Sequence, residues 1–165
     1  MWRFTLTAVA VLGAALMLTP AATAAGPKAH AAAYHFSGKT SQNGGFELLL
    51  ASSFRRTTAH FQYEVSCASG LTFPDEQTGT VRNVFVNKRG HRVSRLKFDA
   101  TGDFNVSVTA PNGVAVTGVS RIHLAGKIRL DTGNANGRIE ADVTLSNGDR
   151  CTSGNSPVTW SASVD

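Results

Sequence analysis

The sequence predicts an all-β protein: an antiparallel β-sandwich or flattened barrel of about nine or ten short strands, with one disulfide. Many short stretches alternate apolar and polar residues with the period of two that is typical of half-buried strands. No stretch keeps an apolar stripe at the 3.6-residue period long enough for a helix. Turn residues, mainly glycine, asparagine, aspartate and proline, separate these stretches. The length of 165 residues suits one such domain.

Residues 1–24 have the features of a secretory signal peptide. Arg3 supplies the positive start, residues 6–18 form the apolar segment, and Ala22-Thr23-Ala24 has the small-x-small form of a cleavage site. The apolar segment is shorter than the roughly 20 residues that span a bilayer, which favours cleavage over a membrane anchor. We therefore expect a secreted, extracellular chain with no membrane span after signal cleavage.

Residues 25–33 are small and polar and predict a flexible lead-in, so the single β domain is expected to cover residues 34–165. Without Arg3, the chain has 15 Lys and Arg residues and 11 Asp and Glu residues, a net charge of +4. Mild positive charge favours anionic partners such as cell-envelope polymers, acidic lipids or nucleic acid, and it does not choose among them.

The clearest strand is residues 60–67, HFQYEVSC, in which Phe61, Tyr63, Val65 and Cys67 alternate with polar residues and are expected to face the core. The same alternation, bounded by turn residues, predicts the other strands. In chain order, the predicted strands are residues 34–36, 46–51, 60–67, 80–87, 92–99, 103–110, 114–117, 120–130, 138–145 and 158–164.

Turn chemistry accounts for the connections between these strands. Residues 88–91 have the length of a hairpin turn and contain a glycine. Pro111-Asn112-Gly113 is the strongest turn signal in the chain, and residues 131–137 predict a further turn. Pro74 and its polar neighbours predict a longer loop over residues 68–76.

Cys67 and Cys151 are the only two cysteines. In an exported chain, we interpret them as one disulfide rather than as a metal or redox site. The bridge would connect an early strand to the end of the domain, and a closed loop of this length restricts the unfolded chain by roughly 4 to 5 kcal/mol in the entropy model. Because no cysteine precedes Cys67, a lipid-modified N-terminus has no attachment residue.

A basic segment at residues 88–97 is the most suggestive candidate for a binding site. It contains five positive charges within ten residues: Lys88, Arg89, Arg92, Arg95 and Lys97. On a strand, Arg95 and Lys97 project from the same face, so this hairpin could hold an anionic polymer. The alternative is a solvated hairpin whose charges discourage edge pairing. Nucleic acid is a weaker expectation, because no aromatic side chain is interleaved with the charges for base stacking.

His35, His60 and His123 lie opposite the apolar faces of their predicted strands, so they could converge only if those strands are neighbours in one sheet. Zinc needs three or four ligands, and no local spacing here supplies even two. We therefore predict solvent-facing histidines, no metal site and no cofactor. His60 and Glu64 share the wet face of strand 60–67, but the sequence shows no partners that would give them a functional role.

The sequence predicts no catalytic residues. Residues 118–122, GVSRI, contain a serine but lack the second glycine of a nucleophile elbow. Asp75 and Glu76 are adjacent in a predicted loop, whereas Glu140 and Asp142 would share a solvent-facing strand face roughly 7 Å apart, within the range of an inverting glycosidase pair. A secreted hydrolase with a site assembled across strands is an alternative hypothesis. A protein-binding or inhibitor module, recognisable by an exposed apolar patch, is another.

Motifs near both ends of the domain suggest a known group of proteins. These motifs are FSGKTSQ at residues 36–42, Cys67 within a strand, GKI at residues 126–128, CTSG at residues 151–154 and VTWSA at residues 158–162. With them, the chain resembles small secreted β-sandwich proteins of the actinobacterial type, whose function is not established. The resemblance covers most of residues 34–163, but the basic segment at residues 88–97 has no counterpart in it. It implies a disulfide-linked β domain outside the membrane, without a known activity.

From these features we predict a secreted, monomeric, non-enzymatic protein with a binding or structural role. Its expected partner is an anionic cell-envelope polymer, held by the hairpin at residues 88–97, or another protein. The sequence alone does not identify the ligand.

Overall fold

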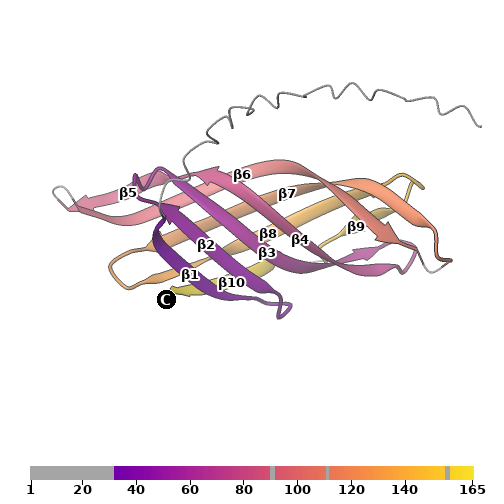
Figure 1. Cartoon of the computed structure of the whole chain (residues 1–165), viewed down its shortest axis with the longest axis horizontal. Coiled ribbons are helices and arrows are strands. Elements are labelled where there is room, and N and C mark those ends of the chain that lie inside the picture. Colours follow the sequence, from indigo (N-terminus) through magenta and orange to yellow (C-terminus); the bar gives the residue numbers. More distant parts are fainter. Residues whose placement is uncertain (1–31, 90–91, 111, 155–156) are drawn as a thin grey trace, which may run out of the picture.

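Ten antiparallel strands make up the fold in the computed structural model (Figure 1), which describes residues 32–89, 92–110, 112–154 and 157–165. The strands are β1 (Ala32–Thr40), β2 (Gly45–Ala51), β3 (Arg56–Cys67), β4 (Thr72–Arg82), β5 (Val84–Arg89), β6 (Arg92–Thr109), β7 (Ala115–Arg129), β8 (Asn134–Leu145), β9 (Arg150–Thr152) and β10 (Val158–Val164). The described residues contain no helix, and hence none with the length and apolar character to cross a membrane.

The strands close into a flattened barrel, which confirms the predicted fold class. Backbone ladders join β10, β1, β2, β3, β9 and β8 into a ring of six strands, because β8 also pairs with β10. The strands β7, β6 and β5 continue from the other edge of β8, and β4 pairs along the other edge of β3. In Figure 1, the indigo and magenta strands β1 to β4 lie in front of the orange and yellow strands β7, β8 and β10.

One junction between the described strands has no backbone ladder. β4 and β5 form an almost continuous strand that is interrupted only at Asn83, yet β4 pairs with β3 and β5 pairs with β6. β4 therefore passes close to β6 without pairing with it, and we call this junction the seam. Asn83 is fixed at the crossover, because its amide donates to the Phe54 carbonyl at 3.0 Å and accepts from Thr57 at 2.9 Å.

The prediction of a loop over residues 68–76 is wrong from residue 72 onward, where the chain forms a strand. β4 already begins at Thr72, and Pro74 lies opposite Glu64 of β3 in the ladder. Proline has no N–H to donate, but an edge strand tolerates it where that position faces the unpaired side. β4 is such a strand, because its other edge faces the seam.

Several predicted strands are parts of longer ones. Residues 92–99 and 103–109 belong to the single strand β6, and the predicted strands 114–117 and 120–130 both lie in or next to β7. β8 begins at Asn134, inside the predicted turn, because its first residues pair with both β7 and β10. β9 has only three residues, which is too short to show an alternating pattern in the sequence.

A transverse row of residues anchors the core. It runs across β6, β7, β8 and β10 as Phe98, Gly126, Gly137 and Trp160. The glycines leave room for the indole, since a Cβ would lie 2.4 Å from the Trp160 ring at Gly126 and 2.6 Å from it at Gly137. Phe46 stacks on the same ring with 4.0 Å between centroids. Trp160 is 3% exposed, which confirms that it is a core residue.

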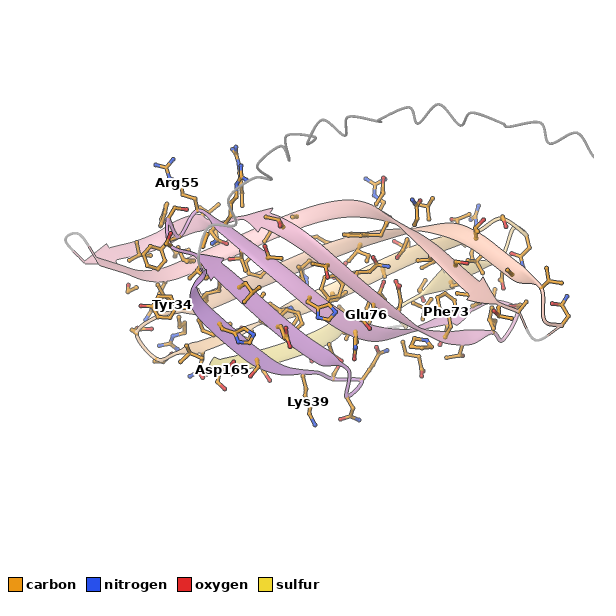
Figure 2. The ribbon with its side chains drawn as sticks, in the orientation of Figure 1. Tyr34, Lys39, Arg55, Phe73, Glu76 and Asp165 are labelled. Atoms are coloured by element: carbon orange, nitrogen blue, oxygen red, sulfur yellow. A yellow bond between two sulfur atoms is a disulfide. The ribbon has the colours of Figure 1, made fainter. Side chains whose placement is uncertain are left out.

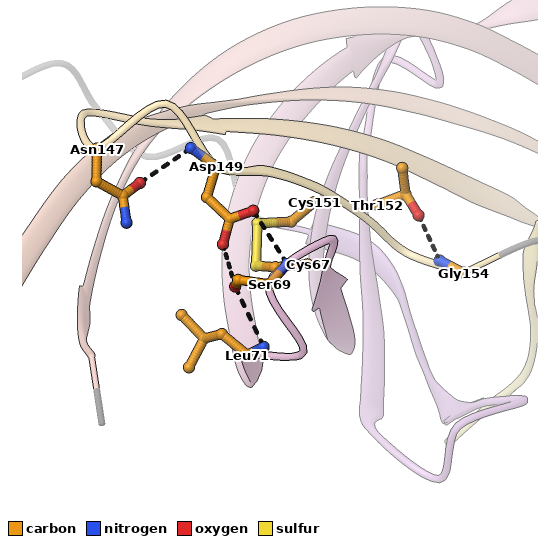
Figure 3. The surroundings of a disulfide bond; sticks show 8 residues. All are labelled: Cys67, Ser69, Leu71, Asn147, Asp149, Cys151, Thr152 and Gly154. Atoms are coloured by element: carbon orange, nitrogen blue, oxygen red, sulfur yellow. Dashed lines mark hydrogen bonds between the residues drawn. A yellow bond between two sulfur atoms is a disulfide. The ribbon is translucent and has the colours of Figure 1, made fainter. Parts of the chain in front are cut away.

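The disulfide Cys67–Cys151 is present, as predicted, and joins β3 to β9 (Figure 3). The two cysteines face each other directly in the ladder, so the bond holds a very short strand in place. Asp149 accepts a hydrogen bond from Ser69, and its carboxylate lies within 4.8 Å of both sulfurs. Metal ligation requires free thiolates, whereas these sulfurs are bonded to each other.

The inward face of strand 60–67 is buried as predicted, and Tyr63 on this face organises a polar group inside the barrel. The Tyr63 hydroxyl donates to the Asp75 carboxylate at 2.5 Å, and the Gln77 amide donates to it at 2.7 Å. Ser120 lies 3.3 Å from the Tyr63 oxygen. Burial raises the pKa of Tyr63, and the hydrogen bond to Asp75 raises it further, so the hydroxyl keeps its proton. Asp75 is thus an interior residue and not a loop residue.

Candidate functional site

The basic segment forms a β-hairpin of β5 and β6, as predicted. Its backbone ladder extends to the pair Arg89 and Arg92. The side chains of residues 87–92 lie outside the described part of the structure. The roles expected for Lys88, Arg89 and Arg92 therefore stay predictions, and the described candidates on this hairpin are Arg95 and Lys97.

Arg95 and Lys97 face two further basic residues on β7. In the β6–β7 ladder, Arg95 lies directly opposite Arg129, and Lys97 lies directly opposite Lys127. All four side chains are exposed on the outer face of the barrel. Directly opposed residues have Cβ atoms about 4.5–5.5 Å apart, so each pair sets two like charges against each other. We call these four residues the basic array.

A third pair of like charges lies across the neighbouring ladder between β3 and β4. Arg56 is directly opposite Arg82, and both side chains are exposed. Arg82 also lines the same surface pocket as Lys97 and Lys127. The third pair therefore adjoins the basic array, across the seam.

Acidic residues neutralise little of this charge. Asp131 lies 3.9 Å from Arg95 and 3.7 Å from Arg129, so one carboxylate serves two guanidinium groups. Lys97 and Lys127 form no ion pair with any residue that the structure describes. Like charges directly opposite each other destabilise a sheet. Asp131 therefore partly relieves the repulsion between Arg95 and Arg129, whereas no acidic residue that the structure describes relieves the repulsion between Lys97 and Lys127.

An open pocket of about 630 Å³ lies on this face, and we call it the basic pocket. Its charged lining residues come from β4, β6, β7 and β8 and are Arg82, Lys97, Asp99, Lys127 and Arg138. Gly126 and Gly137, whose inner side is covered by Trp160, also line it. The Arg138 guanidinium lies 3.3 Å from Glu140, so Arg138 is partly neutralised while the lysines are not.

His123 lies beside the basic pocket, between Asp99 of β6 and Glu140 of β8. Its Nε2 is 2.7 Å from Asp99, and its Nδ1 is 3.5 Å from Glu140. The hydrogen bond to Asp99 raises the pKa of His123 above its ordinary 6.5, burial opposes this, and the contact with Glu140 adds to it. A protonated His123 neutralises Asp99, which lines the basic pocket. The net charge of the pocket therefore depends on pH.

The other two described histidines lie on separate strands with their own carboxylates. His35 is 2.6 Å from Asp165, and His60 is 2.7 Å from Glu76. Glu76 projects from β4 at the centre of Figure 2 and also accepts a hydrogen bond from Gln62 at 3.0 Å. The hydrogen bond from His60 lowers the pKa of Glu76, and the bond from Gln62 lowers it further. The histidines thus face solvent, as predicted, and do not converge.

The residues weighed for catalysis are separated or paired with other groups. Glu140 and Asp142 lie on the outer face of β8 and line a shallow pocket of about 350 Å³, as their alternation predicted. Glu140 is engaged by Arg138 and His123. Ser120, the serine of segment 118–122, is fully buried. The burial of Ser120 and the pairing of Glu140 with Arg138 therefore do not favour the hydrolase hypothesis.

Exposed large apolar residues are dispersed over five strands and one turn. They are Tyr34, Leu49, Val84, Val86, Val114, Val119 and Val164. Single exposed apolar residues are normal on soluble domains and need no partner. They do not favour the protein-binding hypothesis over the anion-binding one.

Half of the basic array was not identified in the sequence. Lys127 and Arg129 are about 30 positions away from Lys97 and Arg95, and only the register of the β6–β7 ladder places them opposite each other. Alternation along residues 120–130 does indicate that both side chains point outward. No local signal shows which strand lies next to them.

No protein-family model, curated protein or solved structure matches the chain. The resemblance to small secreted β-sandwich proteins is therefore still an expectation from the end motifs. The case for function rests on the charges and geometry of the outer face.

Proposed function

We propose that the protein binds anionic polymers of the cell envelope through the basic array and the basic pocket. The observation that supports this function best is the set of three directly opposed like-charge pairs. The surface is wider than the hairpin predicted from the sequence, because the lining of the basic pocket extends over β4, β6, β7 and β8.

Opposed cations favour an anionic ligand for a simple electrostatic reason. Two like charges across a ladder repel each other in the free protein and lower its stability. An anion placed between them is attracted by both and screens their repulsion. Binding therefore relieves a cost in the folded protein, which is a known trade-off between stability and function.

The spacing of the charges favours a chain of repeated anions over one small ion. The Cβ atoms of opposed residues are about 5 Å apart across strands, and successive outward residues are about 6–7 Å apart along a strand. Each exposed ion pair contributes at most about 1 kcal/mol, so a single phosphate would bind weakly. A polymer makes several such contacts at once, and the contacts reinforce each other.

We further propose that the protein acts outside the cell as a monomer, by binding and not by catalysis. The signal-like residues 1–24 would direct export. The Cys67–Cys151 disulfide is compatible with an oxidising compartment. Of the acidic residues weighed for hydrolysis, Glu140 pairs with Arg138 and Asp75 is buried inside the barrel. Glu76 accepts hydrogen bonds from His60 and Gln62, and Asp142 is exposed on β8.

Charge reversal at the centre of the basic array tests this function. The double variant Lys97→Glu with Lys127→Glu removes two cations from the opposed pair and replaces them with anions. A basic residue near an anionic surface contributes about 1 kcal/mol, so the affinity for long-chain polyphosphate should fall by at least about 30-fold. Fluorescence anisotropy with labelled polyphosphate measures the affinity, and retention on purified cell walls should fall in parallel.

Lys39→Glu with Arg150→Glu is the matched control, because it makes the same change in net charge. Lys39 projects from β1 (Figure 2), and Arg150 is exposed on β9. Arg150 is roughly 26 Å from Lys127 along the strands. Lys39 is three ladders away from Lys127, about 14 Å around the barrel, so both residues lie beyond the screening length in physiological salt. The control should bind almost as tightly as the wild type. An equal loss of affinity in both variants would show that only net charge matters and would contradict the proposed site.

A further inference from the structure

A recess opens into the barrel at the seam. It has a volume of about 250 Å³ and lies where β4 and β6 run side by side without pairing. Its inner walls are apolar, because the core residues Phe61, Val81, Ile122 and Leu124 line it. We call this cavity the seam recess.

Small residues on both sides of the seam create the recess. Gly79 on β4 and Ala100 and Gly102 on β6 line it, where larger side chains would fill it. Neither glycine has a positive φ, so the backbone conformation does not require glycine at these positions. The Phe104 ring covers both, since an added Cβ would lie 3.4 Å from it at Gly79 and 3.3 Å at Gly102. Glycine inside a strand often marks a place that another group approaches closely, and at both positions that group is the Phe104 ring.

The seam recess and the basic pocket adjoin each other along two strands. On β4, Val81 lines the recess and the next residue, Arg82, lines the pocket. On β6, Ala100 lines the recess and the preceding residue, Asp99, lines the pocket. Consecutive Cα atoms are about 3.8 Å apart, and their side chains point to opposite faces of the sheet. The recess therefore faces the interior and the basic pocket faces outward, and the two adjoin at the unpaired seam, where Arg82 supplies a positive charge and Asp99 a negative one.

We propose that the seam recess binds the acyl chain of an anionic amphiphile whose charged end lies in the basic pocket. For the charged end, this inference rests on the proposed function. Apolar walls favour an alkyl chain, and the adjoining cations favour a negative head group over a neutral or positive one. At about 30 Å³ for a group of the size of a water molecule, the volume of about 250 Å³ has room for about eight such groups, and a methylene group is of similar size.

The n-alkyl phosphates test this proposal on the unmodified protein. Ethyl, butyl, octyl and dodecyl phosphate are compared by isothermal titration calorimetry below their micelle concentrations. Each methylene that enters an apolar site strengthens binding about fourfold, so the affinity should rise steeply up to octyl phosphate. It should then level off, because the recess is full. Equal affinities along the series would overturn the proposal, and so would an unbroken rise to dodecyl phosphate, which indicates adsorption to a surface.

Filling the recess provides a second, independent test. Ala100→Leu should weaken octyl phosphate binding at least tenfold, because the added side chain takes the space of about three methylene groups, while polyphosphate binding stays unchanged. Ala115→Leu, on an exposed position of β7, adds the same side chain elsewhere and should bind octyl phosphate like the wild type. Wild-type affinity in a folded Ala100→Leu variant would overturn the proposal. If that variant does not fold, the chain-length series decides alone.

The two proposals fail in different ways. A chain-length series without a rise, together with charge-dependent polyphosphate binding, would contradict the seam recess and leave the proposed function intact. A clear chain-length dependence, with polyphosphate binding insensitive to Lys97→Glu and Lys127→Glu, would contradict the proposed function alone. Octanol separates the two ends of the ligand: it should bind at least tenfold more weakly than octyl phosphate. Equal binding of both would overturn the placement of the head group in the basic pocket.

Discussion

The central part of the β3–β4 face and the β6–β7 face both present charged residues to solvent, but they balance charge in different ways. On β3 and β4, Glu76 accepts hydrogen bonds from His60 and Gln62. These hydrogen bonds stabilise the charged carboxylate and so lower the pKa of Glu76. On β6 and β7, the ladder sets Lys97 against Lys127, and neither forms an ion pair with a described residue.

The charged groups at the centre of the β3–β4 face have partners on that face, whereas the opposed lysines on the β6–β7 face have none among the described residues. Where each charge already has a partner, a ligand must break an existing contact before it forms a new one. Where like charges oppose each other, an anion forms contacts without breaking any. Substitutions on the first face should therefore change stability with little effect on binding, whereas substitutions on the second should change stability and binding in opposite directions.

The largest expected effect on stability comes from removing the disulfide, which lies outside the basic face. Cys67→Ser with Cys151→Ser opens a loop of 84 residues. The free energy of unfolding, measured by denaturant titration, should fall by about 4 to 5 kcal/mol in the entropy model. Polyphosphate affinity, measured where the variant is still folded, should stay within about twofold of the wild type, because distant sites act independently. A large loss of affinity in the folded variant would show that the two regions are coupled.

A smaller effect of opposite sign is expected from a single reversal within the basic array. Lys127→Glu turns the repulsive pair with Lys97 into an attractive one, so the variant should be more stable by about 0.5 to 1 kcal/mol and should bind polyphosphate less tightly. Glu76→Gln on the other face should lower the melting temperature slightly and leave binding unchanged. A destabilised Lys127→Glu variant would contradict the idea that the opposed lysines repel each other.

The smallest effect is the pH dependence that His123 imposes on the basic pocket. Because the folded state raises the pKa of His123, its stabilising effect is complete below pH 6.5 and is lost as the pH rises through the raised pKa. Above that pH, Asp99 has no cationic partner in His123 and opposes an anionic ligand. Binding of dextran sulfate, whose charge is constant here, should weaken by roughly twofold between about pH 6 and 8.

His123→Gln is the variant that isolates this effect. The glutamine side chain cannot be protonated, so the dextran sulfate affinity of the variant should change little over the same pH range. The melting temperature of the variant should also depend less on pH than that of the wild type. An identical pH slope in the variant and the wild type would assign the dependence to other groups.

Local patterns in the sequence were sufficient to predict several core residues and the disulfide. Phe61, Tyr63 and Val65 are buried because alternation is a property of each strand alone and does not depend on its neighbours. Trp160 follows the same rule at the other end of the domain. Cys67 could pair only with Cys151 inside the chain, since there are no other cysteines.

The candidate sites depend on which strands are neighbours, and no local pattern encodes that. Lys127 lies opposite Lys97 only because of the β6–β7 register. Pro74 is a loop signal in isolation, but the unpaired edge of β4 at the seam accommodates it in a strand. Gly79 and Gly102 lie between predicted strands, and their common position beside the seam recess appears only once β4 and β6 are placed side by side.

The most direct test of whether the opposed lysines bind the polymer is the salt dependence of polyphosphate affinity in the wild type and in Lys97→Gln with Lys127→Gln. Glutamine removes each positive charge without adding a negative one. Each cation–phosphate contact releases counterions, so the slope of log affinity against log salt concentration counts the contacts. We expect the slope of the variant to be smaller by about 1.5, which corresponds to about 0.7 to 0.9 for each lost contact. Equal slopes in the two proteins would contradict the proposed binding surface.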